Sequence, residues 1–457
     1  MTWACISDFL SSYLAEIVLF FYDTADKAKE PVTKLLLYER SCWDLLDRVN
    51  CSSDNINNKL LQARSSTYLM GYKTCLEIPT LILGIIFGAS SDKIGRRTPM
   101  LMVCFGTVIS SILAMVDTAI LGKSYGIPLL ISGFVQGSLA PGFLLSVACF
   151  GYLADRIGED NRTKRYNVME GVQNVANLFG SLLAASLVDY DGGGSVYIVV
   201  LVLILGTVLS IVFSKREEHE KSNGCEMSEA KKTFETLRKE REGKHALWLL
   251  IFMGCVHKSC ISATEELVLV FCRRKPLLWT KATYCYWRAA TFGGLAIVCI
   301  LILPTLQSKG VDDRKIILTG IFCKSLELLV IWWGATSTWT LFLATLIGAG
   351  GGGVLSTIRG ACTQLVDSDE IGKLLAVSLA ASHLSTLLGV SISLAIYAVT
   401  VNVWSKCAFV VLFGFMALNL IAAQFGTRWL MLSKTERRHI GATKQTNTKD
   451  LVNKGNI

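Results

Sequence analysis

Charged residues are scarce in this sequence of 457 residues. Asp, Glu, Lys and Arg make up 18% of the chain, hydrophobic residues make up 52%, and the mean hydropathy is +0.46. Soluble domains carry about 25% charged residues, so this composition excludes an ordinary soluble protein. A bilayer core about 30 Å thick requires roughly 20 apolar residues per helix. The stretch 195–213 (SVYIVVLVLILGTVLSIVF) contains such a run without a single charge. The composition is that of a multi-pass membrane protein.

Several signals of other protein classes are absent as well. The chain has 15 cysteines, but no two are spaced as C-x-x-C, which argues against a metal or redox site. No G-x-x-x-x-G-K-[ST] loop is present, so ATP is not the expected energy source. No nucleophile, base and orienting group recur together, and no basic segment precedes the first apolar run. We therefore expect a protein that is not an enzyme, has no cofactor or metal, and uses its first span as targeting signal.

Apolar windows between charged residues predict an all-α membrane protein with twelve transmembrane helices. A charged segment at 215–245 divides them into two groups of six. We expect an N-terminal six-helix bundle over 1–214, a cytoplasmic linker over 215–245, a C-terminal six-helix bundle over 246–431 and a cytoplasmic tail over 432–457. The expected spans are 12–37, 67–90, 98–120, 126–153, 165–189, 195–214, 246–272, 283–306, 315–336, 339–366, 374–400 and 406–431.

The distribution of basic residues predicts the orientation. Lys and Arg concentrate in the linker, in the gaps on the same side of the membrane, and in the tail. Cytoplasmic loops carry such an excess, so both termini are expected in the cytoplasm. The net charge of +9 follows from this topology and gives no reason to expect nucleic acid as a partner. The sequon Asn50-Cys-Ser falls in an outer gap, which predicts glycosylation at Asn50.

A compact charged motif occupies the short gap after the second expected span. It has the form G-x-x-x-D-x-x-G-R-R, with Gly88, Asp92, Gly95, Arg96 and Arg97. The pattern resembles the signature loop of the major facilitator superfamily, and a weaker copy (G-x-x-D-R-K) occurs at 310–315, after the eighth span. The resemblance implies the major facilitator fold, in which this loop is a latch that opens as the two halves rock. The alternative is a basic anchor without a conformational role.

Other segments resemble a particular solute carrier family, the one that contains the proton-coupled folate transporter, also called haem carrier protein. They are GYLAD, NRTKR and YNVME within 151–170, STIRGACTQLV at 356–366, and EPVT and LYERSC within 30–42. The resemblance extends over about 15–430. It implies proton-coupling roles for Glu170, His257 and Asp155, and a substrate-related role for Arg359.

The same resemblance raises the question of a disulfide. The family pairs a cysteine of the first loop with one in a Pro-Leu-Cys-Trp run, but this chain has Pro-Leu-Leu-Trp at 276–279. If a bridge forms, Cys42 or Cys51 is expected to pair with Cys272 or Cys285.

Ionisable residues inside apolar spans are the remaining candidates. Inserting a charged side chain at the bilayer centre costs at least ~2.5–3.5 kcal/mol, so the charged residues that persist in such spans usually face an internal cavity. Arg359 offers a bidentate fork for a carboxylate or phosphate, or else forms a salt bridge to another span. Glu170 either carries the coupled proton or pairs with Arg165 or Lys164. His257 either assists proton transfer or is only hydrogen-bonded. Asp26 and Glu77 are assigned to the substrate pathway with Arg359.

These observations predict a secondary active transporter of a small organic anion, coupled to protons and working by alternating access in the lipid bilayer. Within the resembled family, folates, muropeptide-like fragments, cyclic dinucleotides and haem-related solutes all remain open as substrates. The plasma membrane and the lysosomal membrane both remain open as the location. The alternative function is a non-transporting receptor or scaffold on the same fold, because a fold does not fix a function.

Overall fold

A computed structural model describes residues 13–50, 59–94, 97–119, 126–139, 142–154, 159–214, 244–363, 365–366, 371–401 and 403–425. Within these ranges the chain is helical and contains no β-strand. The helices up to residue 213 are α2 (Leu14–Asn50), α3 (Lys59–Ile94), α4 (Arg97–Ala119), α5 (Ile127–Leu139), α6 (Gly142–Ala154), α7 (Glu159–Leu187), η1 (Asp191–Gly193) and α8 (Gly194–Phe213).

The helices from residue 244 onward show two interruptions. The segment from 281 to 308 passes through a π-helical turn, and the segment from 338 to 363 passes through a 3-10 turn. These elements are α10 (Lys244–Cys272), α11 (Lys281–Ile297), η2 (Val298–Ile302), α12 (Leu303–Ser308), α13 (Asp313–Gly334), α14 (Thr338–Gly348), η3 (Ala349–Gly353), α15 (Val354–Thr363) and α16 (Ile371–Thr400), followed by a helix at Cys407–Phe425.

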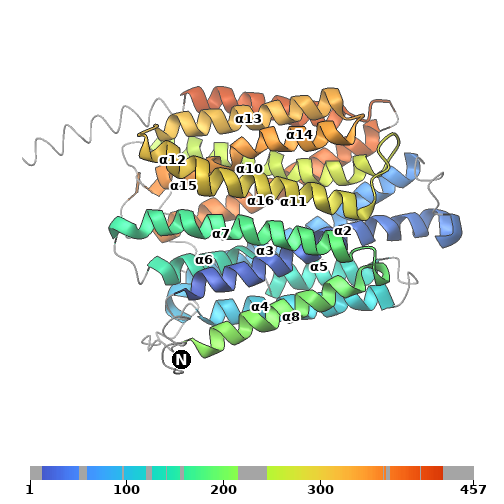
Figure 1. Cartoon of the computed structure of the whole chain (residues 1–457), viewed down its shortest axis with the longest axis horizontal. Coiled ribbons are helices and arrows are strands. Elements are labelled where there is room, and N and C mark those ends of the chain that lie inside the picture. Colours follow the sequence, from blue (N-terminus) through green and yellow to red (C-terminus); the bar gives the residue numbers. More distant parts are fainter. Residues whose placement is uncertain are drawn as a thin grey trace, which may run out of the picture.

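The helices lie in two groups, side by side across the long axis of the molecule. Those from α2 to α8 gather in the lower part of Figure 1, and those from α10 to α16 gather in the upper part. At the boundary, α7 packs against α11, and α3 packs against α16. The two groups therefore meet along helices that are far apart in the sequence.

Within the described ranges, nine helical segments are long and apolar enough to cross a membrane. The chain is thus a multi-pass membrane protein, as the composition predicts. The long helices α2, α3 and α7 are not among the nine, because charged residues interrupt their apolar runs. The count of twelve spans therefore stays a prediction.

The helix α8 illustrates how these helices are built. It is apolar on every side, which is typical of a helix in contact with lipid or a large core. One face is buried against the protein and contains Val196, Val200, Ile204 and Ile211. The opposite face remains exposed although it is also apolar, and it contains Ile198, Val202, Leu205 and Leu209. An exposed apolar face of this kind is suited to lipid chains.

The glycine run at 350–353 allows close packing in the second group. A Cβ on Gly351 would lie 3.2 Å from the carbonyl oxygen of Gly320 in α13. A side chain there would crowd that carbonyl, so glycine suits the close approach of η3 to α13. The run thus forms a packed 3-10 turn in this structure.

The disulfide expectation needs correction. Cys42 is disulfide-bonded, but its partner is not one of the residues that the structure describes. Cys272 and Cys285 are buried free thiols. A bridge from the first loop to either of them is therefore wrong. The apolar packing around both cysteines explains why they serve as small hydrophobic residues.

Candidate functional site

A cavity of about 490 Å³ lies between the two groups of helices. It is lined by side chains from α2, α3 and α7 on one side and from α10, α15 and α16 on the other. Many of these side chains are charged, although they lie deep in the protein. The acidic lining residues are Asp23, Asp26, Glu30, Glu77, Glu170, Glu265 and Glu266, and the basic ones are Lys27, Lys29, Lys73, Lys258, Lys324 and Arg359.

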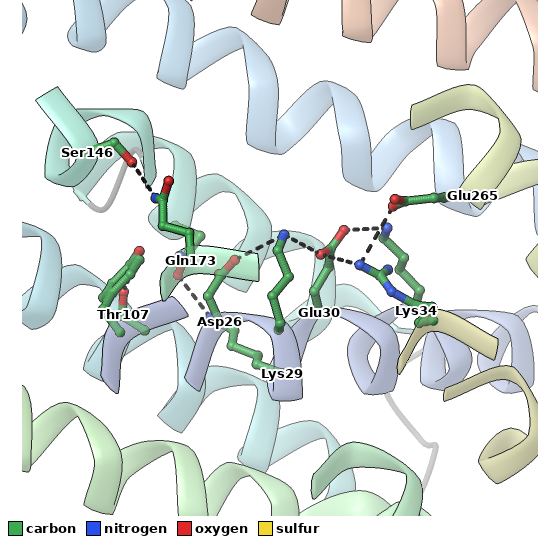
Figure 2. Close-up of polar contacts among 12 residues, drawn as sticks. Asp26, Lys29, Glu30, Lys34, Thr107, Ser146, Gln173 and Glu265 are labelled. Atoms are coloured by element: carbon green, nitrogen blue, oxygen red, sulfur yellow. Dashed lines mark hydrogen bonds and ion pairs between the residues drawn. The ribbon is translucent and has the colours of Figure 1, made fainter. Parts of the chain in front are cut away.

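Glu30 of α2 is the centre of the densest ion-pair cluster. Its Oε1 lies 2.6 Å from Lys34 Nζ, and its Oε2 lies 2.8 Å from Lys27 Nζ. Figure 2 shows Glu30 between Asp26 on one side and Lys34 on the other, with Glu265 on the same side as Lys34. Arg288 of α11 completes the cluster, with NH2 3.0 Å from Glu30 Oε2. This contact joins the two groups of helices.

A second contact between the groups is formed by Lys34 and Glu266 of α10. Their charged atoms are 2.5 Å apart, and each side chain is only 1% exposed. Lys73 of α3 lies 3.4 Å from the same carboxylate oxygen. Because unpaired charges this deeply buried are costly, such pairs hold the two groups together at this level.

Glu170 and Arg359 form a further ion pair between the two groups of helices. Arg359 NH1 donates to Glu170 Oε1 at 3.1 Å, which joins α15 to α7. The side chain of Arg359 is 39% exposed and that of Glu170 is 22% exposed, whereas those of Lys34 and Glu266 are each 1% exposed. This ion pair is therefore more accessible than the one between Lys34 and Glu266.

A histidine that the sequence analysis did not select also bridges the groups. His383 of α16 places Nδ1 2.8 Å from Glu77 Oε2 of α3. Both residues line the cavity. His383 could have been selected from the sequence, because an ionisable residue within a long apolar run is a reason to suspect function. Glu265, Glu266 and Lys258 were accessible by the same reasoning.

The candidate residues from the sequence fall into two classes. Four of them line the cavity: Asp26, Glu77, Glu170 and Arg359. His257 does not, because it is fully buried and its ring packs near Gly351. Glu77 has no evident partner in the sequence, but in the structure it is paired with His383. Glu170 is paired with Arg359 of another helix.

The remaining candidates lie in parts that the structure does not describe. Asp155, Gly95 and Arg96 are outside the described residues. Gly88 and Asp92 belong to α3 and Asn50 ends α2, but their side chains are not described. Arg97 is the first residue of α4. The latch and the glycosylation site therefore stay predictions.

Comparison with known families defines the class. A model of the Major Facilitator Superfamily matches residues 65–322, which is more than half of the chain. The chain therefore belongs to this superfamily of membrane transporters, as its charged loop motif predicts. The lysosomal proton-coupled steroid conjugate and bile acid symporter SLC46A3 of Gallus gallus is 22% identical over 421 residues, which cover 87% of this chain and 90% of the relative. This confirms the resemblance to a solute carrier family.

Solved structures share the fold. The human organic anion transporter MFSD10 (TETRAN) superimposes with a TM-score of 0.67 at 14% identity, over 91% of this chain and 99% of that one. A D-xylose-proton symporter gives a TM-score of 0.62 at 13% identity, over 92% and 97% of the two chains. At these identities the likeness shows the fold alone.

Proposed function

We propose that this protein is a proton-coupled secondary transporter of a small organic anion. It has twelve spans in two six-helix halves, 1–214 and 246–431, with a cytoplasmic linker at 215–245 and a cytoplasmic tail at 432–457. The single observation that carries the proposal is the ion pair between Glu170 and Arg359, which faces the cavity and joins the two groups of helices. The protein is not an enzyme, and its partners are the solute, protons and the lipid bilayer.

The ion pair supplies a mechanism for coupling. When a proton binds the carboxylate of Glu170, the charge that holds Arg359 disappears. The guanidinium then has free donors for a carboxylate or phosphate on the solute, which it can bind with its planar fork. When the solute leaves and Glu170 loses the proton, the pair forms again. Proton and anion are therefore carried in the same step, and each return of the empty carrier begins from the paired state.

The names of similar proteins support both the proton coupling and the anionic solute of this proposal. The chicken relative is named as a proton-coupled symporter of steroid conjugates and bile acids, and the superimposed human protein is named as an organic anion transporter. The chicken relative is also named as lysosomal, so we infer that an acidic compartment supplies the proton. We therefore propose that steroid conjugates and bile acids be tested first, together with folates.

The other sequence candidates take supporting roles in this proposal. Asp26 and Glu77 contribute to the solute pathway, and His257 and Asp155 to proton transfer. Asn50 is the glycosylation site. The conformational latch consists of Gly88, Asp92, Gly95, Arg96 and Arg97.

Uptake into vesicles tests the proposal. Purified protein is reconstituted, and uptake of labelled taurocholate, a folate and a cyclic dinucleotide is measured with and without an inward proton gradient. We expect the gradient to drive accumulation of at least one anion. In Glu170→Gln, which cannot take up or release the proton, accumulation should be lost while exchange of labelled for unlabelled solute partly survives.

Glu39→Gln is the matched control. Glu39 also forms an ion pair between the groups, 2.7 Å from Lys281 Nζ, but it does not line the cavity. Accumulation should persist in this variant. Binding of an anion without any flux would favour the receptor function instead, and proton-driven accumulation that is intact in Glu170→Gln would remove Glu170 from the coupling.

A further inference from the structure

One lysine in the cavity has no partner among the described residues. Lys258 of α10 lines the cavity, yet it has no carboxylate within ion-pair distance and no hydrogen bond in the part of the chain that the structure describes. The other basic residues of the lining all have an oxygen partner: Lys27 with Glu30, Lys29 with Ser110 and Gln136, Lys73 with Glu266, Lys324 with Glu327, and Arg359 with Glu170.

The acidic residues near Lys258 are engaged with other partners. Glu265 and Glu77 attract it, while Lys27, Arg359 and Lys73 repel it. Glu77 is paired with His383. Glu265 is itself engaged with Arg288, 3.6 Å away. A cation inside the span of a membrane protein is costly unless a counter-charge accompanies it. The structure thus contains a basic position at the cavity wall that an anion would stabilise.

A neutral donor lies beside it. Ser262 is four residues further along α10, so it shares the same face of the helix. It also lines the cavity, and its hydroxyl has no hydrogen-bond partner in the described part of the chain. Many other serines and threonines in these helices donate back to a carbonyl one turn earlier, as Thr264 does to Cys260. Ser262 remains available to a ligand.

We propose that Lys258 and Ser262 form the subsite for the acidic group of the transported solute. The group is a carboxylate, sulfonate or phosphate, whose oxygens accept from the ammonium and from the hydroxyl. This inference rests on the proposed function and adds to it. Arg359 is released only when Glu170 is protonated, whereas Lys258 is available in the resting state. The solute is therefore bound first at Lys258, and Arg359 engages it after protonation.

The test uses an organic sulfonate of known structure, so it does not depend on knowing the solute. Full-length protein with Ser262→Cys is treated with the anionic reagent 2-sulfonatoethyl methanethiosulfonate or the cationic 2-(trimethylammonium)ethyl methanethiosulfonate. Labelling of the introduced thiol is followed by mass spectrometry of its peptide. The quantity measured is the ratio of the anionic rate to the cationic rate, with Lys258 intact or replaced by methionine.

The expected change follows from Coulomb's law. Side chains four residues apart on a helix are about 5–6 Å apart. Even in water, a unit charge at that distance changes the rate of each reagent about threefold, in opposite directions. Lys258→Met should therefore lower the ratio about tenfold. Lys258→Gln should do the same if the methionine variant folds poorly, and Lys258→Arg should retain the ratio of the parent.

Lys309→Met is the charge control, because Lys309 is an exposed lysine outside the cavity lining. Its ratio should not change. An unchanged ratio in both neutral variants of Lys258, or an equal fall in Lys309→Met, overturns the subsite. Labelling requires no transport, so the two proposals fail separately. A changed ratio without proton-driven uptake leaves the anion subsite in place and overturns the transporter.

Discussion

The ion pair between Arg40 and Asp117 provides a quantitative test of how these helices are held together. Arg40 of α2 donates from Nε to Asp117 Oδ2 of α4 at 2.8 Å, and from NH2 to the Asp117 carbonyl oxygen at 3.2 Å. The two side chains are 3% and 0% exposed. Asp117→Asn preserves the shape but leaves a buried guanidinium without its carboxylate.

The size of the effect follows from burial. Removing one partner of a buried ion pair costs about 3–5 kcal/mol, because the remaining charge is uncompensated. The same helix offers a matched control, since Asp44 pairs with Arg64 at 2.6 Å while Arg64 is 51% exposed. Exposed pairs contribute about 0–1 kcal/mol, so Asp44→Asn should cost little.

Thermal unfolding in detergent, followed by tryptophan fluorescence, measures both variants. At roughly 2–4 °C per kcal/mol, the midpoint should fall by roughly 6–20 °C for Asp117→Asn. It should fall by no more than roughly 4 °C for Asp44→Asn. Equal shifts for the two variants would refute the reasoning that burial, rather than the presence of an ion pair, sets the contribution.

Two further predictions concern transport. Arg359→Lys should impair uptake of the anion nearly as much as Arg359→Ala, because a point charge on a flexible stem does not reproduce a planar two-donor contact; full affinity in the lysine variant would mean that Arg359 does not bind the solute. His383→Leu removes the hydrogen-bond partner of the buried Glu77 carboxylate, so it should impair uptake more than His383→Gln, which can still donate a hydrogen bond there. Equal uptake in the two variants would mean that the contact with Glu77 does not contribute to transport.

The sequence predicts much of the helical architecture because the bilayer imposes it. A run such as 195–213 has no alternative to a helix in lipid, where every backbone polar group must be satisfied internally, and α8 covers Gly194–Phe213. The cost of charge in an apolar span likewise selects Asp26, Glu77, Glu170 and Arg359, and all four line the cavity. The first helix was harder to delimit, because α2 continues past residue 37 to Asn50 with a more polar sequence.

Only the tertiary structure decided which charges meet. Glu170 pairs with Arg359 and Glu77 with His383, across distances in sequence that no local pattern spans, and Cys272 and Cys285 remain free. The neighbours His257 and Lys258 show the physical reason. Successive residues of an α-helix point about 100° apart, so the packing of α10 alone determines which of the two faces the cavity. In this protein His257 is buried against η3, and Lys258 lines the cavity.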